Sequence, residues 1–218
     1  MLLTLSQAPS IGALLLFIPL ALATAGCGEG SSSSGGGGSP VPGCTLGFLG
    51  ERGKPTEIQL VARGAGLTPT MSPLADHDQV AMILPPQGGR VILVGARATN
   101  INACAVDLKG VLKDTATGQI RVDERTVNLQ PDSDGWGGSV AGNISTFANV
   151  PTCPNQWASQ DIYGSSFELT VSVADSEGNK ASKTVNVVPF CAEPENADEC
   201  ACECKKDYKL GQMCEPTP

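Results

Sequence analysis

The chain has 218 residues, with 22 acidic and 14 basic side chains and a formal net charge of -8 at pH 7. A nucleic-acid binder neutralises phosphates with clustered Lys and Arg, and the longest basic run here is the pair Lys205-Lys206. This composition excludes nucleic acid as a partner. Because an acidic surface also repels anionic headgroups, we expect any membrane attachment to use lipid rather than a basic patch.

Glycine and proline are frequent, with 26 and 16 residues, while aromatic residues make up only 4% of the chain. Long helices are therefore disfavoured, and short strands joined by turns are favoured. We expect an all-β main domain over residues 44–190. It is preceded by an export signal (1–26) and a spacer (27–43), and followed by a cysteine-rich tail (191–218).

The first 26 residues have the features of an export signal. Residues 11–23 form an apolar run that is too short for a bilayer core, which needs about 20 residues, and that has the length of a signal-peptide core. Small residues from Thr24 to Gly26 lead into Cys27, and here the chain resembles a bacterial lipoprotein precursor. The resemblance implies cleavage before Cys27, acylation of Cys27 with fatty acids such as palmitate, and, because Gly28 rather than Asp follows, an outer-membrane location.

The alternative to lipidation is an ordinary secretory signal cut between Ala23 and Ala25, which leaves Cys27 as one more thiol. The segment 28–43 consists largely of Gly and Ser. This composition predicts a disordered tether whose ends lie on the order of 20 to 25 Å apart. Such a tether suits a folded domain held away from a lipid surface.

A β-hairpin is the clearest element of the main domain. Apolar and polar residues alternate over 167–173, turn residues fill 175–179, and a Val-rich strand returns over 181–188. Residues 165–188 resemble the last two strands of an immunoglobulin-like domain of the bacterial cell-surface kind. The resemblance implies an immunoglobulin-like antiparallel β-sandwich, without the Cys, Trp, Cys spacing that marks antibody domains.

Further short segments have the composition of strands, and turn signals at 85–89, 114–118 and 131–135 separate them. This regular spacing is typical of a sandwich. The remaining predicted strands are 57–62, 80–84, 91–98, 105–113, 119–122, 125–129 and 142–147.

Nine cysteines indicate an oxidising compartment, because reducing compartments keep thiols free and scarce. Without Cys27, eight cysteines remain. An even number predicts that all of them pair, in four disulfides, and eight cysteines can be paired in 105 different ways. Cys104 opens a strand and Cys153 lies in the loop 150–155, so these two are the first candidate pair, and closing that loop would stabilise the fold by about 4 kcal/mol. The eight candidates are Cys44, Cys104, Cys153, Cys191, Cys200, Cys202, Cys204 and Cys214.

In the tail, Cys200, Cys202 and Cys204 are too close together in sequence for neighbours to bond each other. Residues 202–214 resemble the second half of an EGF-like module, with a Cys-x-Cys pair, an aromatic residue four positions on and a final Cys. That resemblance implies a Cys204–Cys214 disulfide around a small hairpin. We expect one of the other tail cysteines to bond Cys44. A zinc site is the competing interpretation, disfavoured because zinc sites more often use Cys-x-x-Cys.

The sequence contains no recognisable catalytic or cofactor-binding motif, so we expect neither an enzyme nor a cofactor. His77, flanked by Asp76 and Asp78, is the only histidine. It would serve as the base of a hydrolase only if it lay beside a hydroxyl such as Ser139, and Ala141 stands where a nucleophile elbow needs Gly. A solvated turn is the simpler interpretation of His77.

Two further features suggest ligand binding. Asp132 and Asp134, followed by a Gly, resemble the start of a calcium loop, but a polar hairpin turn is the simpler interpretation because the acidic residue expected further along is absent. Trp136 and Trp157 are candidates for stacking on sugars, or for covering the edge of a core. The sequence as a whole favours a non-catalytic surface lipoprotein in adhesion or envelope scaffolding; the alternative is a module that binds a ligand or glycan through the sandwich loops.

Overall fold

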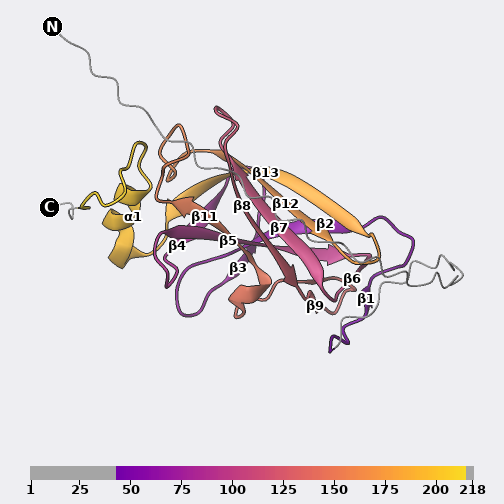
Figure 1. Cartoon of the computed structure of the whole chain (residues 1–218). Helices are drawn as coiled ribbons and strands as arrows, with labels where there is room; N and C mark the ends of the chain where they lie inside the picture. Colours follow the sequence, from indigo (N-terminus) through magenta and orange to yellow (C-terminus); the bar gives the residue numbers. More distant parts are fainter. Residues whose placement is uncertain (1–42, 215–218) are drawn as a thin grey trace, which may run out of the picture. The chain divides into compact units, whose positions relative to one another are not determined.

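The computed structural model describes residues 43–214 (Figure 1). The predicted export signal (1–26), the lipidation site Cys27 and nearly all of the spacer lie outside the described residues. Within 43–214 the fold is all-β, as the composition predicts, with one short α-helix. No helix in this part of the chain is long and apolar enough to cross a bilayer.

The strands are mostly short and are joined by turns, while β5 and β13 are the longest. The elements in chain order are β1 (Phe48–Leu49), β2 (Glu57–Arg63), β3 (Met71–Pro73), β4 (Asp78–Ile83), β5 (Arg90–Thr99), β6 (Ile101–Asn102), β7 (Val106–Lys113), β8 (Ile120–Val127), β9 (Gln130–Pro131), β10 (Gly137–Gly138), η1 (Ile144–Thr146), β11 (Ala148–Cys153), β12 (Phe167–Ala174), β13 (Lys180–Cys191), η2 (Pro194–Asn196) and α1 (Ala197–Glu203).

The hairpin of β12 and β13 confirms the clearest prediction from the sequence. Every second residue of β12 is buried, because a strand with period two turns one face to the core. Phe167 stands opposite Val187 and Leu169 opposite Val185 in an antiparallel ladder. The Asp175 carboxylate closes the turn by accepting hydrogen bonds from two backbone N–H groups within it.

Strand β4 connects two groups of strands. It pairs in parallel with the end of β13, from Asp78 opposite Val187 to Met82 opposite Cys191, and antiparallel with β5 at Met82 and Ile83. One group runs β13-β12-β7-β8, and the other has β5 at its centre, flanked by β2 and β4 on one edge and β11 and β10 on the other. The sheet is therefore mixed and curled, which corrects the prediction of a purely antiparallel arrangement.

The core lies between these two groups. All residues of β5 except Arg97 are buried, as expected for a strand covered on both faces. Gly110 of β7 marks the closest approach: a Cβ placed there would lie 2.7 Å from Val150 of β11 and 2.9 Å from Val94 of β5. At the edge of the core, the Asp123 carboxylate of β8 accepts a hydrogen bond from the Asn149 N–H of β11, at 2.7 Å.

The predicted break between 119–122 and 125–129 was wrong, because β8 continues through it. Charged residues at the break stay within the sheet because they are paired there. Arg125 donates to Asp123 along the strand, at 2.6 Å. Glu124 pairs with a lysine of β7, at 3.1 Å.

The predicted strand 142–147 was also wrong. Asn143 accepts a hydrogen bond from Ser145 N–H and so begins the 3-10 helix η1. The strand starts afterwards, as β11, and includes Pro151, which the sequence placed in a loop. Pro lacks a backbone donor, but in the described residues β11 pairs only with β5, so one edge needs no donor from Pro151.

Candidate functional site

All eight cysteines between 43 and 214 form disulfides, which confirms the predicted number of four. The predicted partners were wrong: Cys104 does not bond Cys153, and Cys204 does not bond Cys214. The observed bonds are Cys44–Cys104, Cys153–Cys204, Cys191–Cys200 and Cys202–Cys214.

Cys104 and Cys153 lie at opposite ends of β5. Cys153 stands opposite Arg90, the first residue of that strand, whereas Cys104 follows its far end. A ten-residue strand is about 30 Å long, so no disulfide can join them. Cys104 instead lies beside the start of the main domain, residues 44–190, which is called the body below. There Ala103 N–H donates to Gly47 C=O, and Cys104 bonds Cys44. The expected bond from Cys44 to the tail was therefore also wrong.

The short helix α1 explains the tail pairing. Positions four apart lie on one face of a helix, and the position between them points away. Cys200 and Cys204 therefore face the body, while Cys202 faces outward and bonds Cys214. The EGF-like pairing assumed a hairpin at this point and chose the wrong cysteine of the Cys-x-Cys pair.

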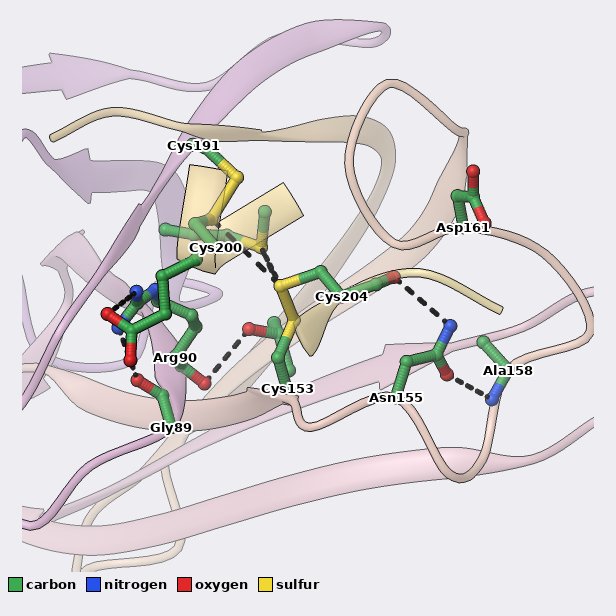
Figure 2. Close-up of a disulfide and its surroundings, with 12 residues drawn as sticks. Gly89, Arg90, Cys153, Asn155, Ala158, Asp161, Cys191, Cys200 and Cys204 are labelled. Carbon is green, nitrogen blue, oxygen red and sulfur yellow. Dashed lines mark hydrogen bonds and ion pairs between the residues drawn. A yellow bond between two sulfur atoms is a disulfide. The ribbon is translucent and has the colours of Figure 1, made fainter. Parts of the chain in front are cut away.

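The tail is fixed to the body by a buried cluster of sulfur atoms, shown in Figure 2. Cys153, Cys200 and Cys204 are at most 5% exposed. The Sδ atom of Met82 lies 3.9 Å from Cys153 Sγ and 3.8 Å from Cys204 Sγ. Because the sulfurs of Cys200, Cys202 and Cys204 are all committed to disulfides, the zinc interpretation of these residues is wrong; within 43–214 no other cluster of three or more His, Cys, Asp or Glu residues is arranged to hold a metal ion.

A buried arginine lies under α1. The Arg90 side chain is 1% exposed; it donates to Glu199, at 3.3 Å, and to Gly89 C=O, at 3.1 Å (Figure 2). Its Nε and the Oε2 of Glu203 are buried without a hydrogen-bond partner. Burial raises the pKa of Glu203, Arg90 opposes that effect, and the Glu199 charge adds to it.

The loop 154–166 completes the attachment with hydrogen bonds to the tail backbone. Asn155 N–H donates to Glu203 C=O, at 2.8 Å, and Ile162 N–H donates to Cys204 C=O, at 2.8 Å. Lys206 N–H donates to the Asp161 carboxylate, at 2.7 Å. The first two bonds satisfy C=O groups at the end of α1 that the helix itself leaves unpaired.

Two surface hollows flank the tail residues Asp207 and Tyr208. The first has a volume of about 400 Å³ and is lined by Tyr163, Lys205 and Lys206, among others. The second, of about 440 Å³, is lined by Trp157 and Tyr208, among others. Both tyrosines of the chain therefore line the first hollow. The side chains around the first hollow are Tyr163, Asp198, Ala201, Cys202, Lys205, Lys206, Asp207, Tyr208 and Gln212.

The two tryptophans occupy different environments. Trp157 is 6% exposed, its indole N–H donates to Thr152 C=O at 2.8 Å, and its ring packs on Phe167. Trp157 is therefore mainly a core residue, with one edge at the second hollow. Trp136 lies on the surface with the guanidinium of Arg97 over its ring, 5.5 Å from the centroid.

The candidate calcium ligands Asp132 and Asp134 both bind Arg97, at 2.8 and 3.1 Å. The hydrogen bond to Asp132 raises the pKa of Arg97. Partial burial would raise the pKa of Asp134, but hydrogen bonds from Trp136 N–H and Arg97 lower it. An arginine thus supplies the positive charge between these carboxylates, and the sequence did not indicate it because Arg97 lies 35 residues earlier, on β5.

His77 lies in an exposed turn. Its Nε2 is 3.4 Å from Asp76, which accepts hydrogen bonds from the backbone and side chain of Asn186. Ser139, the hydroxyl considered with it, is buried and donates to Thr146 C=O, at 2.6 Å. Among the described residues no hydrogen bond joins His77 to Ser139, so the structure does not bring the hydrolase candidates together.

The chain matches no protein-family model, no curated protein and no solved structure. Its functional assignment therefore depends on its own geometry. The junction of body and tail combines buried charge, touching disulfides and aromatic hollows. Sequence reasoning identified its cysteines and Trp157, and named Tyr208 only as the aromatic residue of the EGF-like pattern. It missed Arg90, whose sequence signal was a charged residue directly before the apolar run of β5.

Proposed function

We propose that this protein is a non-catalytic, lipid-anchored module of the cell envelope, acting in adhesion or scaffolding at the outer membrane. The lipobox-like segment ending at Cys27 and the Gly/Ser spacer support the anchor. The observation that carries the proposal is the pairing of all eight cysteines between 43 and 214 into disulfides. Such a set is stable in an oxidising space outside the cytosol.

The strand order supports an immunoglobulin-like sandwich. In that fold one sheet contains the first, second and fifth strands, with the fourth beside the fifth, and the other contains the third, sixth and seventh. Here β4, β5 and β11 correspond to the first set, and β7, β12 and β13 to the second, with β8 added beside β7. Among the described residues no strand pairs with β11 in the place of the fourth. The body would serve as a rigid unit displayed on its tether.

The anchor is tested by labelling growing cells with radioactive palmitate and fractionating their membranes. The wild-type protein takes up label and sediments with the outer membrane. Cys27→Ser carries no label and is released in soluble form. Cys44→Ser is the matched control, since it removes a cysteine after the spacer; it keeps the label. An unlabelled wild-type protein would overturn the anchor.

The adhesive role is tested with beads coated with the protein through its N-terminus. Coated beads are expected to bind whole cells or envelope fragments, and prior reduction of the disulfides is expected to abolish binding. Beads that bind no better than beads coated with albumin would contradict adhesion. The scaffolding role is tested by comparing the detergent sensitivity of cells that lack the protein with that of wild-type cells. Equal sensitivity would contradict scaffolding.

A second candidate function is binding of a glycan at the tail hollows. The observation that favours it is the concave surface that includes Trp157 and Tyr208; aromatic faces and polar groups in a hollow of this size suit a small polar ligand. Tyr208→Ala is expected to weaken binding on a glycan array at least tenfold, whereas Met213→Ala, at an exposed tail residue that lines neither hollow, serves as the control. An array with no positive spot would contradict this function.

A further inference from the structure

Two disulfides touch each other at the junction of body and tail. Cys200 belongs to the Cys191–Cys200 bond and Cys204 to the Cys153–Cys204 bond. Their Sγ atoms are 4.0 Å apart, in van der Waals contact. Both residues face the body from one turn of α1, and Cys204 N–H donates to Cys200 C=O, at 3.0 Å. Figure 2 shows the two yellow bonds side by side.

The two bonds differ in access. Cys200 is 3% exposed, Cys204 0% and Cys153 5%, whereas Cys191, at the end of β13, is only partly buried. A reductant from solution therefore meets the sulfur of Cys191 first. Attack on that sulfur expels the inner sulfur, so the thiolate forms on Cys200, the residue that touches the second disulfide.

We propose that these four cysteines form a thiol–disulfide exchange site, whose substrate is an external dithiol of the Cys-x-x-Cys type. One thiolate of the dithiol bonds to Cys191 Sγ and breaks its bond to Cys200. The Cys200 thiolate then bonds to Cys204 Sγ, and the electron pair leaves on Cys153, which takes up a proton. The second thiol of the dithiol loses its proton, attacks the mixed disulfide and frees Cys191. The dithiol is thereby oxidised, and the protein ends with one new disulfide, Cys200–Cys204, in place of the original two.

The product of this exchange fits the helix. Residues four apart in an α-helix have Cα atoms about 6 Å apart, within the range of Cα separations found in disulfides. The Met82 side chain contacts both sulfurs of the Cys153–Cys204 bond, which the Cys200 thiolate attacks. The Cβ atoms of residues four apart in a helix are about 5–6 Å apart, wider than in a disulfide. Exchange therefore needs a change of side-chain rotamer at Cys200 and a shift of Cys204, which lies at the C-cap just after the last residue of α1.

The exchange removes the covalent link between the tail and the end of β11. Cys200–Cys204 and Cys202–Cys214 both lie within the tail, so residues 192–214 remain attached only through the chain itself and through non-covalent contacts. Those contacts are the Arg90 to Glu199 ion pair, the packing of Cys200 and Cys204 in the core, and hydrogen bonds. The hydrogen bonds join Glu193 to Leu84, Glu203 and Cys204 to the loop residues Asn155 and Ile162, and Lys206 to Asp161. We infer that reduction by a dithiol partner releases the tail from the body. This inference does not depend on the lipid anchor.

The test uses the mature protein purified in detergent and treated, without denaturant, with one equivalent of dithiothreitol. Free thiols are alkylated, and disulfide-linked peptides are mapped after digestion with trypsin and an enzyme that cleaves after Glu. The expected product has alkylated Cys191 and Cys153 and a new bond between Cys200 and Cys204. Alkylation of Cys191 and Cys200 with the Cys153–Cys204 bond intact would overturn the proposal.

The double variant Cys191→Ser with Cys200→Ser is the matched control, because it keeps Cys153–Cys204 and removes the attacking thiol. Its Cys153 is expected to become alkylated at least about tenfold more slowly than in the wild type, since the attack is no longer intramolecular. A circular dichroism spectrum like that of the wild type verifies that the variant is folded. Equal rates in the two folded proteins would show that Cys153 is released without Cys200, contrary to the proposal.

Discussion

At the scale of single residues, buried carboxylates at two places have opposite effects on stability. Asp114, at the end of β7, is fully buried. Burial would raise the pKa of Asp114, but hydrogen bonds from Ser159, Ala116 and Thr117 outweigh that effect and lower the pKa to about 2. Glu203 has fewer partners, and its pKa is raised. One carboxylate is therefore stabilised as an anion, and the other is destabilised.

Because the pKa of Asp114 is lowered in the folded state, its contribution to stability is present above pH 4 and is lost as the pH falls towards 2. We expect that contribution to be about 2 kcal/mol. Asp114→Asn should lower the free energy of unfolding at pH 6, and the difference from the wild type should shrink at pH 2. Urea unfolding at both pH values measures this. Asp107→Asn, at an exposed site on β7, controls for loss of charge; an equal loss of stability in the two variants would contradict the account.

Because the pKa of Glu203 is raised in the folded state, its ionised form costs stability above that pKa, and the cost disappears below the unfolded pKa. Glu203→Gln should therefore raise the melting temperature at pH 7 and leave it unchanged at pH 3. The matched variant Glu199→Gln should lower it at pH 7, because it removes the anion paired with buried Arg90. Calorimetry at the two pH values decides; a lower melting temperature for Glu203→Gln at pH 7 would mean that its charge is stabilising.

At the scale of elements, the fit between the two groups of strands depends on Gly110. A methyl group at this position would meet Val150 and Val94 closer than 3 Å, and neither branched side chain can rotate away freely. Gly110→Ala is expected to lower the free energy of unfolding by about 1 to 3 kcal/mol. Gly142→Ala, which has open space around its Cβ position, is the control. Equal denaturant midpoints for the two variants would show that the groups of strands are less closely packed.

The sequence predicted those elements whose own residues decide their structure. The β12 and β13 hairpin, β2, β4, β5 and β7 follow from period-two patterns or apolar runs flanked by turns. It failed where distant partners decide. Charges of β8 are paired along the strand and with β7, Pro151 is tolerated because of its edge position, and the Asp132 and Asp134 turn is organised by Arg97. Cysteine pairing could not be predicted because it depends on which end of β5 each residue reaches and on the unforeseen helix α1.

At the scale of the whole molecule, disulfides bind both the start and the tail of the described chain to the body. Removing Cys153–Cys204 opens a loop with a sequence separation of 51 and is expected to cost about 4 kcal/mol in the chain-entropy model. The double variant Cys153→Ser with Cys204→Ser is compared with Cys202→Ser with Cys214→Ser, whose separation is 12 and whose expected cost is about 3 kcal/mol. A larger loss from the second variant in urea unfolding would contradict the idea that the tail is fixed at Cys153.

The central claim is that the protein leaves the cytosol, is acylated at Cys27 and holds its other cysteines in four disulfides. Intact mass spectrometry of the protein extracted from membranes, with and without reduction, tests the three parts together. We predict a chain that begins at Cys27, carries fatty acyl groups, and gains eight hydrogens on reduction, two for each disulfide. A chain that begins at Met1, has no acyl groups and has the same mass before and after reduction would contradict the account.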